Sequence, residues 1–336
     1  MRYLVSFILG LSFLPAAHAF DRQKLLSSFF STVMVRGYKA DGGLAYGSGV
    51  VVAKNQVLTN CHVFRETNKP WVSRGEDSYI IDAVQADRWH DLCLVTTTGL
   101  PFDPVAIGDD AALRKGQSVV AIGHSSGSPA PLTSIGVLKS LYPMDEGNVI
   151  RSTARFALGA SGSGLYDDTG HLIGINTFKT IGHDAYFYAL PIAWLDQVRK
   201  LPVERQFPIT GKAFWEADRE DKPYFMQVAV PQLHQDWTAL LEVAERWTGQ
   251  QPQSTEAWYE LGVAHENLGH EADADQAYRH SVQLDPLNTD SLFRIGMLAS
   301  KKGNADEVHA INLAILDIDK DLAAEFSKAA GCSGTC

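Results

Sequence analysis

Residues 20–200 carry short apolar runs, each bounded by Gly, Asp, Asn or Pro. Runs of this length and spacing are typical of strands in a sandwich or barrel, whereas a parallel sheet would need helical stretches between them. A helix is expected only at residues 191–200, where Pro191 takes the first position. The pattern predicts an all-β first domain over residues 20–200. The runs lie at residues 49–53, 79–84, 92–96, 118–123, 133–141, 171–177 and 186–190.

The hydrophobic period changes to that of helices near residue 231, after a proline-containing segment over residues 201–230 that we interpret as a linker or a wrapping segment. The later residues follow the spacing of a tetratricopeptide repeat (TPR), although His265 and Ser281 depart from it. A weaker copy follows, and a partial one precedes at residues 236–252. We therefore expect an all-α TPR-like domain over residues 231–336. The matching positions are Trp258, Leu261, Gly262, Gly269, Ala274, Tyr278 and Pro286, with Gly296 and Gly303 in the weaker copy.

The N-terminus has the pattern of a signal peptide over residues 1–19. Arg2 precedes a twelve-residue apolar run, which is too short to span a membrane, and Ala17-His18-Ala19 forms a cleavage site. We expect a periplasmic or secreted protein with no integral membrane segment after cleavage. The formal net charge of −10 argues against nucleic acid as a partner.

Three polar residues in separate parts of the β-rich region suggest nucleophilic catalysis. His62 follows a strand-like run over residues 47–58, Asp91 opens another apolar run, and Ser161 lies between glycines. A serine hydroxyl needs a nearby base, and the base needs a group that fixes its tautomer. His62 fits as the base, Asp91 as the orienting acid and Ser161 as the nucleophile.

Glycines before and after Ser161 permit a tight turn. In such a turn the backbone N–H groups of Gly159 and Ser161 can form an oxyanion hole. A competing nucleophile is Ser125, because residues 123–127 match the Gly-x-Ser-x-Gly elbow of α/β-hydrolases. The prolines that follow Ser125 argue against the helix that this elbow requires.

Four cysteines allow three full pairings, and export makes disulfides possible. If His62 and Asp91 touch, a bridge between the neighbouring Cys61 and Cys93 is geometrically possible; the alternative is two buried thiols. Cys332 and Cys336 could close a small loop in the C-terminal tail. No second cysteine or histidine cluster completes a zinc site, and no metal or organic cofactor is implied.

The order His, Asp, Ser and several phrases resemble the HtrA/Deg branch of trypsin-like serine peptidases. The resemblance spans about residues 30–195, and its phrases are GSGVVV…VLTNCHV, DLCLV, IGDDAALRKGQSVVAIG, GASGSG and HLIGINT. It implies a two-barrel fold with the site between the barrels. It also implies peptide-bond hydrolysis by His62, Asp91 and Ser161, with Gly159 as an oxyanion donor.

The chain departs from this branch in ways that affect the expected function. A TPR-like segment stands where a PDZ domain is usual, and Ala160 and Ser163 replace commoner residues. We assign Arg155 and Thr177 to the substrate pocket, where a cation at Arg155 would favour an acidic residue before the cleaved bond.

These observations together predict a serine endopeptidase that acts on protein or peptide substrates, with the TPR-like domain as a docking surface for a protein partner. The alternative is a non-catalytic adaptor in which the protease fold and the repeats only bind proteins.

Overall fold

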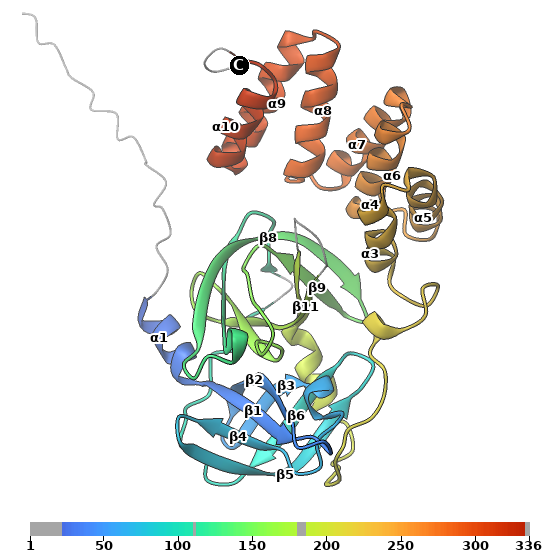
Figure 1. Cartoon of the computed structure of the whole chain (residues 1–336). Coiled ribbons are helices and arrows are strands. Elements are labelled where there is room, and N and C mark those ends of the chain that lie inside the picture. Colours follow the sequence, from blue (N-terminus) through green and yellow to red (C-terminus); the bar gives the residue numbers. More distant parts are fainter. Residues whose placement is uncertain (1–21, 110–111, 180–185, 333–336) are drawn as a thin grey trace, which may run out of the picture.

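The protein is described by a computed structural model over residues 22–109, 112–179 and 186–332 (Figure 1). The expected signal peptide and Cys336 lie outside these residues. Among the described residues, no helix is both long and apolar enough to cross a membrane.

The β-rich region folds into closed antiparallel barrels, as the sequence predicts, and a helix, α1 (Arg22–Phe30), precedes them. In the first barrel the neighbouring strands are β1 (Thr32–Tyr38), β2 (Leu44–Ala53), β3 (Gln56–Asn60), β6 (Leu92–Thr97), β5 (Asp77–Asp87) and β4 (Trp71–Arg74). In the second they are β10 (Ser163–Asp167), β11 (Leu172–Lys179), β12 (Phe187–Pro191), β9 (Gly147–Ser152), β8 (Leu132–Met144) and β7 (Ser118–Gly123).

The predicted apolar runs lie in strands, apart from His171 and Tyr186, which directly precede theirs. Their β-branched and aromatic side chains fill the barrel interiors and the interface between the barrels. The strand-like run over residues 47–58 is divided between β2 and β3 by a turn at Asn55, whose φ is 61°. The helix expected at residues 191–200 is interrupted. Pro191 closes β12, and a 3₁₀ turn, η4 (Ile192–Trp194), precedes the short helix α2 (Leu195–Val198).

Of residues 201–230, those up to residue 216 wrap around the first barrel, whereas residues 224–227 already form a helix that packs on the second barrel. Glu204 exchanges backbone hydrogen bonds of 2.8 and 2.9 Å with Val84 of β5. Further along, Ile209 is buried in the first-barrel core, and its N–H donates to the carbonyl of Phe64 at 3.2 Å. The segment then forms η5 (Phe214–Glu216), another 3₁₀ turn. Of the two interpretations of this segment, the wrapping one describes the structure.

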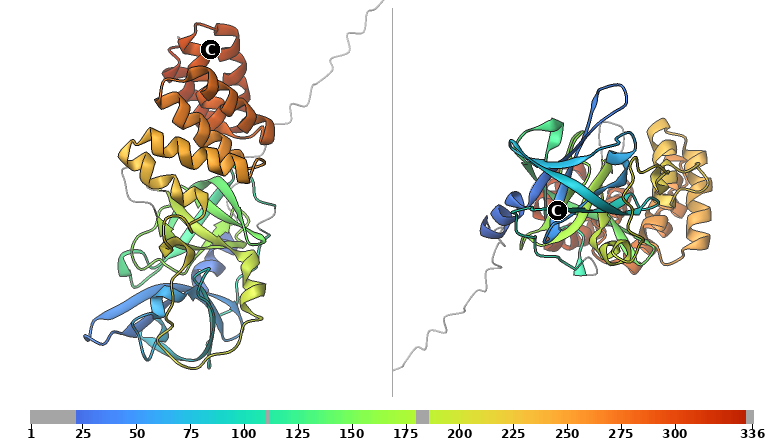
Figure 2. Two further views of the ribbon diagram at one scale, coloured as in Figure 1. Left: turned by 90° about the vertical axis from the view of Figure 1, so that its right-hand side faces the viewer. Right: turned by 90° about the horizontal axis from the view of Figure 1, so that it is seen from below.

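Helices follow the wrapping segment and stack against the second barrel (Figures 1 and 2). They are α3 (Tyr224–Gln227), α4 (Ala229–His234), α5 (Trp237–Gln250), α6 (Thr255–Asn267), α7 (Glu271–Leu284), α8 (Thr289–Lys301), α9 (Ala305–Ile318) and α10 (Lys320–Ala329). The first TPR is therefore α6 and α7, and its weaker copy is α8 and α9.

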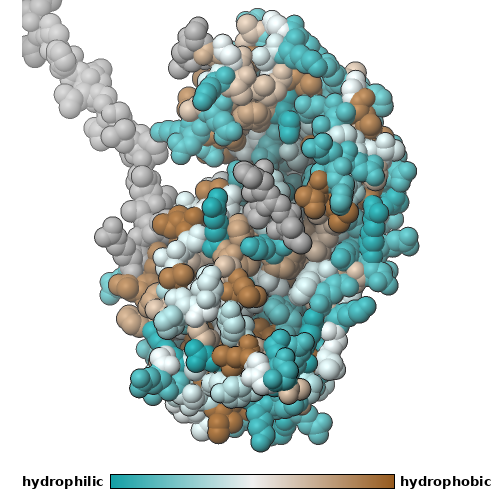
Figure 3. Space-filling model, in the orientation of Figure 1, coloured by the Kyte–Doolittle hydropathy of each residue, from teal (hydrophilic) through white to brown (hydrophobic). Residues whose placement is uncertain are grey.

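Glycines let neighbouring helices of the repeats approach closely. A Cβ on Gly262 would lie 2.5 Å from the Tyr278 ring, and one on Gly296 would lie 2.4 Å from the Phe326 ring. Gly269 and Gly303 adopt φ values of 82° and 72° in the turns that follow α6 and α8. In the face seen in Figure 3, the outer surface of these helices is mostly hydrophilic, because their apolar sides are buried against their neighbours.

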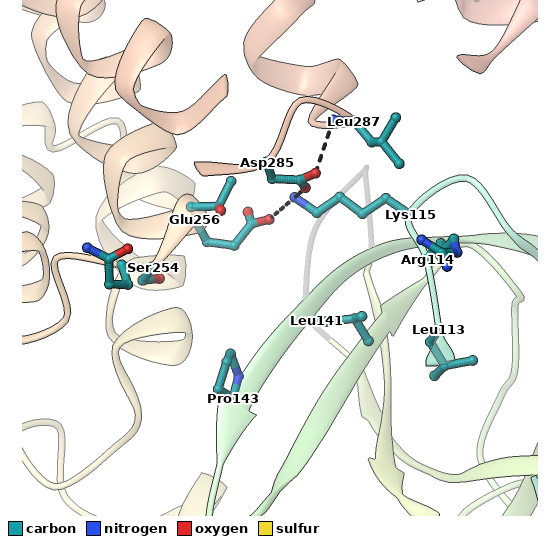
Figure 4. A pocket seen from close by; sticks show the side chains of 11 residues that line it. Leu113, Arg114, Lys115, Leu141, Pro143, Ser254, Glu256, Asp285 and Leu287 are labelled. Atoms are coloured by element: carbon teal, nitrogen blue, oxygen red, sulfur yellow. Dashed lines mark hydrogen bonds and ion pairs between the residues drawn. The ribbon is translucent and has the colours of Figure 1, made fainter. Parts of the chain in front are cut away.

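The helical region and the second barrel share one buried core. Tyr142 of β8 stacks on Phe225 of α3 at 4.4 Å, and the same cluster continues to Trp247 and Tyr278. A charged contact lies beside it. Lys115 donates to Glu256 of α6 at 2.6 Å and lies 3.4 Å from Asp285, at the edge of a pocket between the two regions (Figure 4). These contacts fix the first TPR on the second barrel.

Candidate active site

His62 and Asp91 form a closely coupled pair on the first barrel. His62 lies in η1 (Cys61–Phe64), directly after β3, and Asp91 precedes β6. The Asp91 carboxylate accepts two hydrogen bonds from His62, from Nδ1 at 2.6 Å and from the backbone N–H at 2.8 Å. Asp91 is fully buried and the His62 side chain is 24% exposed. The pair therefore fixes one ring orientation and leaves Nε2 as the remaining functional nitrogen.

Several bonds hold the loop that carries Asp91. The φ of Asp91 is 58°, an uncommon value for a residue other than glycine, so this backbone conformation depends on its neighbours. The Asp91 carbonyl accepts from the Cys61 N–H at 3.1 Å and from Asn60 Nδ2 at 2.9 Å. A disulfide joins Cys61 to Cys93 with a Cα–Cα distance of 4.9 Å. Of the two alternatives left open by the sequence, the structure contains the bridge. The other expected pairing involves Cys336, outside the described residues, and stays a prediction.

Ser161 lies in a tight turn that is held against β2. The Ser48 N–H donates to the Ser161 carbonyl at 2.7 Å, and Ser48 Oγ donates to the Gly159 carbonyl at 2.8 Å. Gly159 and Gly162 have φ values of 93° and 86°. A Cβ on Gly162 would lie 2.2 Å from the Ser48 carbonyl oxygen, so this position requires glycine. The turn thus brings Ser161 from the second barrel to a strand of the first.

The backbone N–H groups of this turn fall into two sets. Those of Ala160, Gly162 and Ser163 donate to protein carbonyls at 3.0, 2.9 and 2.8 Å. Those of Gly159 and Ser161 have no acceptor within the described residues. The Gly159 and Ser161 pair was named from the sequence as an oxyanion hole, and these are the two donors that the turn leaves available for an external oxygen.

His62 and Ser161 line the same cleft, which has a volume of about 450 Å³. The Ser161 hydroxyl donates to the Thr177 carbonyl at 3.4 Å. Catalytic hydrogen bonds are often loose before substrate binds, so this geometry is compatible with a nucleophile and base pair. The other lining residues are Lys39, Leu44, Ala45, Tyr46, Val63, Arg65, Glu66, Leu158, Gly159, Trp215 and Glu216.

The wrapping segment contributes residues to this cleft that the sequence analysis did not identify. Trp215 of η5 meets the His62 ring edge to face at 5.7 Å between centroids. Arg65 lies 5.7 Å from the Trp215 ring and forms an ion pair with Glu216. Burial raises the pKa of Glu216, but hydrogen bonds from Arg65 and from the Ala213 N–H outweigh it, so the pKa is lowered overall. The only sequence signal was the aromatic and acidic character of Phe214–Glu216.

The remaining predicted site residues lie around the cleft rather than in it. Thr177 is buried, and its Oγ1 accepts from Asn60 at 2.9 Å. Arg155 is exposed and does not line the cleft, so its role in an acidic preference stays a prediction. Ser125 begins η3 (Ser125–Gly127), and its Oγ accepts from the Ala157 N–H at 3.1 Å. No helix follows it before β8, so it does not form a hydrolase elbow.

One group of side chains within the described residues has the spacing of metal ligands. His265, His270 and Asp273 place ligand atoms within 4.8 Å of one another. They lie in α6, α7 and the turn between these helices, away from the residues that line the cleft. Nothing in the arrangement of His62, Asp91 and Ser161 calls for a metal.

Comparison with known protein families agrees with both parts of this architecture. A trypsin-like peptidase domain matches residues 47–175, and a tetratricopeptide repeat matches residues 255–288. The chain thus carries a trypsin-like serine peptidase domain that resembles the HtrA/Deg branch, with a tetratricopeptide repeat in place of PDZ.

Individual relatives match part of this chain and part of their own length. The serine protease Do-like HtrB of Bacillus subtilis is 31% identical over 163 residues, which are 43% of this chain and 35% of the relative. The periplasmic pH-dependent serine endoprotease DegQ of Escherichia coli is 34% identical over 141 residues, 39% of this chain and 30% of the relative. Among the first curated relatives, the match spans from 21% to 47% of their length.

A solved structure supports the fold. The active form of the Rv3671c protease from M. tuberculosis matches 63% of this chain and 99% of its own, with a TM-score of 0.50 and 19% sequence identity. At this identity the likeness concerns the arrangement of the barrels alone.

Proposed function

We propose that this protein is an exported serine endopeptidase that uses Ser161, His62 and Asp91 as its catalytic triad. The observation that carries the proposal is the two-point hydrogen bonding of His62 by a buried Asp91, in the cleft that Ser161 also lines. The serine peptidase domain of the relatives supports the same reaction class.

In the proposed reaction, Ser161 Oγ attacks the carbonyl carbon of the peptide bond while His62 Nε2 takes the hydroxyl proton. The oxyanion that forms accepts hydrogen bonds from the N–H groups of Gly159 and Ser161. His62 then passes the proton to the leaving amine, and an acyl-enzyme remains. A water molecule, deprotonated by His62, attacks the ester carbonyl, and Ser161 recovers its proton from His62. Asp91 keeps Nδ1 protonated and stabilises the imidazolium throughout.

Export is supported by three independent features. The sequence has a signal-peptide pattern over residues 1–19. The disulfide between Cys61 and Cys93 belongs to an oxidising compartment. In addition, one relative is named as a periplasmic endoprotease. We therefore propose a periplasmic or secreted location.

The test of the triad is covalent labelling of the purified mature chain with a fluorophosphonate. The proposal predicts one adduct, on Ser161, and none in the Ser161→Ala variant. Ser125→Ala serves as a matched control, because Ser125 also lies in a glycine-containing turn on the second barrel, and this variant should label like the wild type. A folded protein that takes no label would contradict the triad and favour the adaptor alternative.

We further propose that the TPR helices bind segments of protein substrates. Because these helices share a core with the second barrel, removing them would expose apolar surface, so a truncation cannot test this role. Cross-linking mass spectrometry of the inactive Ser161→Ala chain with β-casein can. The proposal predicts cross-links from casein to lysines of α8 and α10. Cross-links confined to the barrels would contradict it.

A further inference from the structure

A second His–Asp pair lies next to the first and has the same geometry. Asp87, at the end of β5, accepts from the His90 N–H at 3.0 Å and from His90 Nδ1 at 2.7 Å. The corresponding bonds from His62 to Asp91 are 2.8 and 2.6 Å. His90 directly precedes Asp91 in the chain. Like His62, it is held by a carboxylate through two hydrogen bonds.

The two pairs differ at the other ring nitrogen. Whereas the His62 ring lies in the cleft, His90 Nε2 faces a second carboxylate, that of Asp145, at 3.0 Å. A neutral imidazole has one N–H and can donate to only one of two carboxylates. Hydrogen bonds to both require the doubly protonated imidazolium. This geometry favours the imidazolium form of His90, which has no free nitrogen lone pair to act as a general base.

The three residues connect the two barrels. Asp87 belongs to β5 of the first barrel, and Asp145 belongs to the turn between β8 and β9 of the second. The His90 ring packs on Trp194 of η4 at 4.0 Å, and Trp194 Nε1 donates to the Asp145 carbonyl at 2.9 Å. His90 is 8% exposed and the Asp87 side chain is 16% exposed, so water screens this pair weakly, whereas the Asp145 side chain is 56% exposed.

We propose that His90, as an imidazolium between Asp87 and Asp145, is a positioning residue that holds the Asp91 loop against the second barrel. The inference rests on the proposed function only for its effect on turnover. Asp91 has a positive φ and depends on its neighbours to keep the carboxylate under His62. Loss of the His90 charge would release His90 from the two carboxylates. Asp91, the next residue in the chain, would then hold His62 less firmly in its orientation.

This arrangement makes the site sensitive to alkaline pH. The charged groups in contact with His90 are Asp87 and Asp145, while Trp194 carries no charge. Burial lowers the pKa of His90, but its bonds to the two carboxylates outweigh burial and raise the pKa above the ordinary value of 6.5. The stabilisation is therefore fully present below pH 6.5 and is lost as the pH rises through the folded pKa.

The primary test is an NMR titration of the full mature protein with ¹⁵N-labelled histidine side chains. We expect one imidazole, absent from the spectrum of His90→Gln, to keep both nitrogens protonated at pH 6.5, where an unperturbed imidazole is half neutral. As it titrates, the Nδ1–H resonance of His62 should shift, because that proton reports the bond to Asp91. A neutral His90 at pH 6.5 would overturn the proposal. So would a His62 Nδ1–H chemical shift that stays constant while His90 titrates. This readout needs no peptidase activity, so it separates failure of the inference from failure of the proposed function.

The second test is the pH profile of peptide hydrolysis in Asp145→Asn, a mild change because the Asp145 side chain is 56% exposed. Removing one carboxylate should lower the His90 pKa and move the alkaline limb of kcat to lower pH by about one unit, with KM little changed. His171→Gln is the matched control, because His171 also faces an aspartate, Asp167, on the second barrel. An unmoved limb in Asp145→Asn, or the same movement in the control, would contradict the role of His90.

Discussion

Replacing Glu260 by Gln is expected to stabilise the protein at neutral pH and to have little effect near pH 4. Glu260 lies on α6, is 5% exposed and accepts a hydrogen bond from Gln232 at 2.5 Å. Burial between the helices and the second barrel raises its pKa from 4.5 to about 8, despite the opposing effect of Arg151. At pH 7 the folded protein therefore holds a proton on Glu260 that the unfolded chain has lost.

The magnitude follows from proton linkage. Because the folded state binds more protons than the unfolded one between pH 4.5 and 8, stability falls across this window as the pH rises. At about 1.4 kcal/mol per pH unit, the loss is on the order of 3 kcal/mol at pH 7 and 5 kcal/mol above pH 8. Gln keeps the shape and the contact with Gln232 without ionising, so the variant should recover this free energy.

The assay is denaturant unfolding of the wild type and Glu260→Gln from pH 4 to 8.5, followed by tryptophan fluorescence. The matched control is Glu256→Gln, one helical turn earlier on the same helix. Burial raises the pKa of Glu256, but Lys115 and Arg151 outweigh burial and lower it. Removing its charge should therefore destabilise the protein at neutral pH by about 3–5 kcal/mol. Equal unfolding free energies for the wild type and Glu260→Gln at pH 7, or a change of the same sign in both variants, would refute the reasoning.

Three further predictions concern the candidate site. Asp91→Asn should lower kcat by about 10⁴-fold with the fold intact, because an amide does not hold His62 in the required tautomer; a loss below tenfold in peptide hydrolysis would contradict this. Replacing both Cys61 and Cys93 by Ser should reduce the unfolding free energy by about 3–4 kcal/mol, since the bridge spans a separation of 32 residues. An unfolding free energy equal to that of the wild type, measured by denaturant unfolding, would contradict this. Trp215→Ala should reduce kcat/KM about 3- to 10-fold through the lost aromatic contact with His62, and wild-type kinetics would show that the wrapping segment does not support the site.

The parts of the fold that depend on local contacts could be predicted from the sequence. The TPR helices pack against helices that are close to them in the sequence, so the spacing of Gly262 and Gly296 carried the information about their packing. The strands that the apolar runs did not reveal depend on pairing with neighbouring strands of the barrel. β9 includes Asn148 and Arg151, which break the apolar run, and it pairs with β8 and β12 on either side. Its pairing partners, rather than its composition, make it a strand.

The candidate site shows the same limit. His62, Asp91 and Ser161 could be chosen because each residue type stands in a characteristic local phrase. Trp215 could not, because it reaches His62 only after residues 201–214 have crossed the first barrel. His90 was passed over for a similar reason: its meaning comes from Asp145, which approaches it from the second barrel.

Fluorophosphonate labelling of the mature protein, read by peptide mass spectrometry, would show whether Ser161 is an activated nucleophile. We expect one adduct on Ser161 at neutral pH, lost in Ser161→Ala and strongly reduced in Asp91→Asn. A folded chain without an adduct, or with an adduct on Ser125 instead, would contradict it.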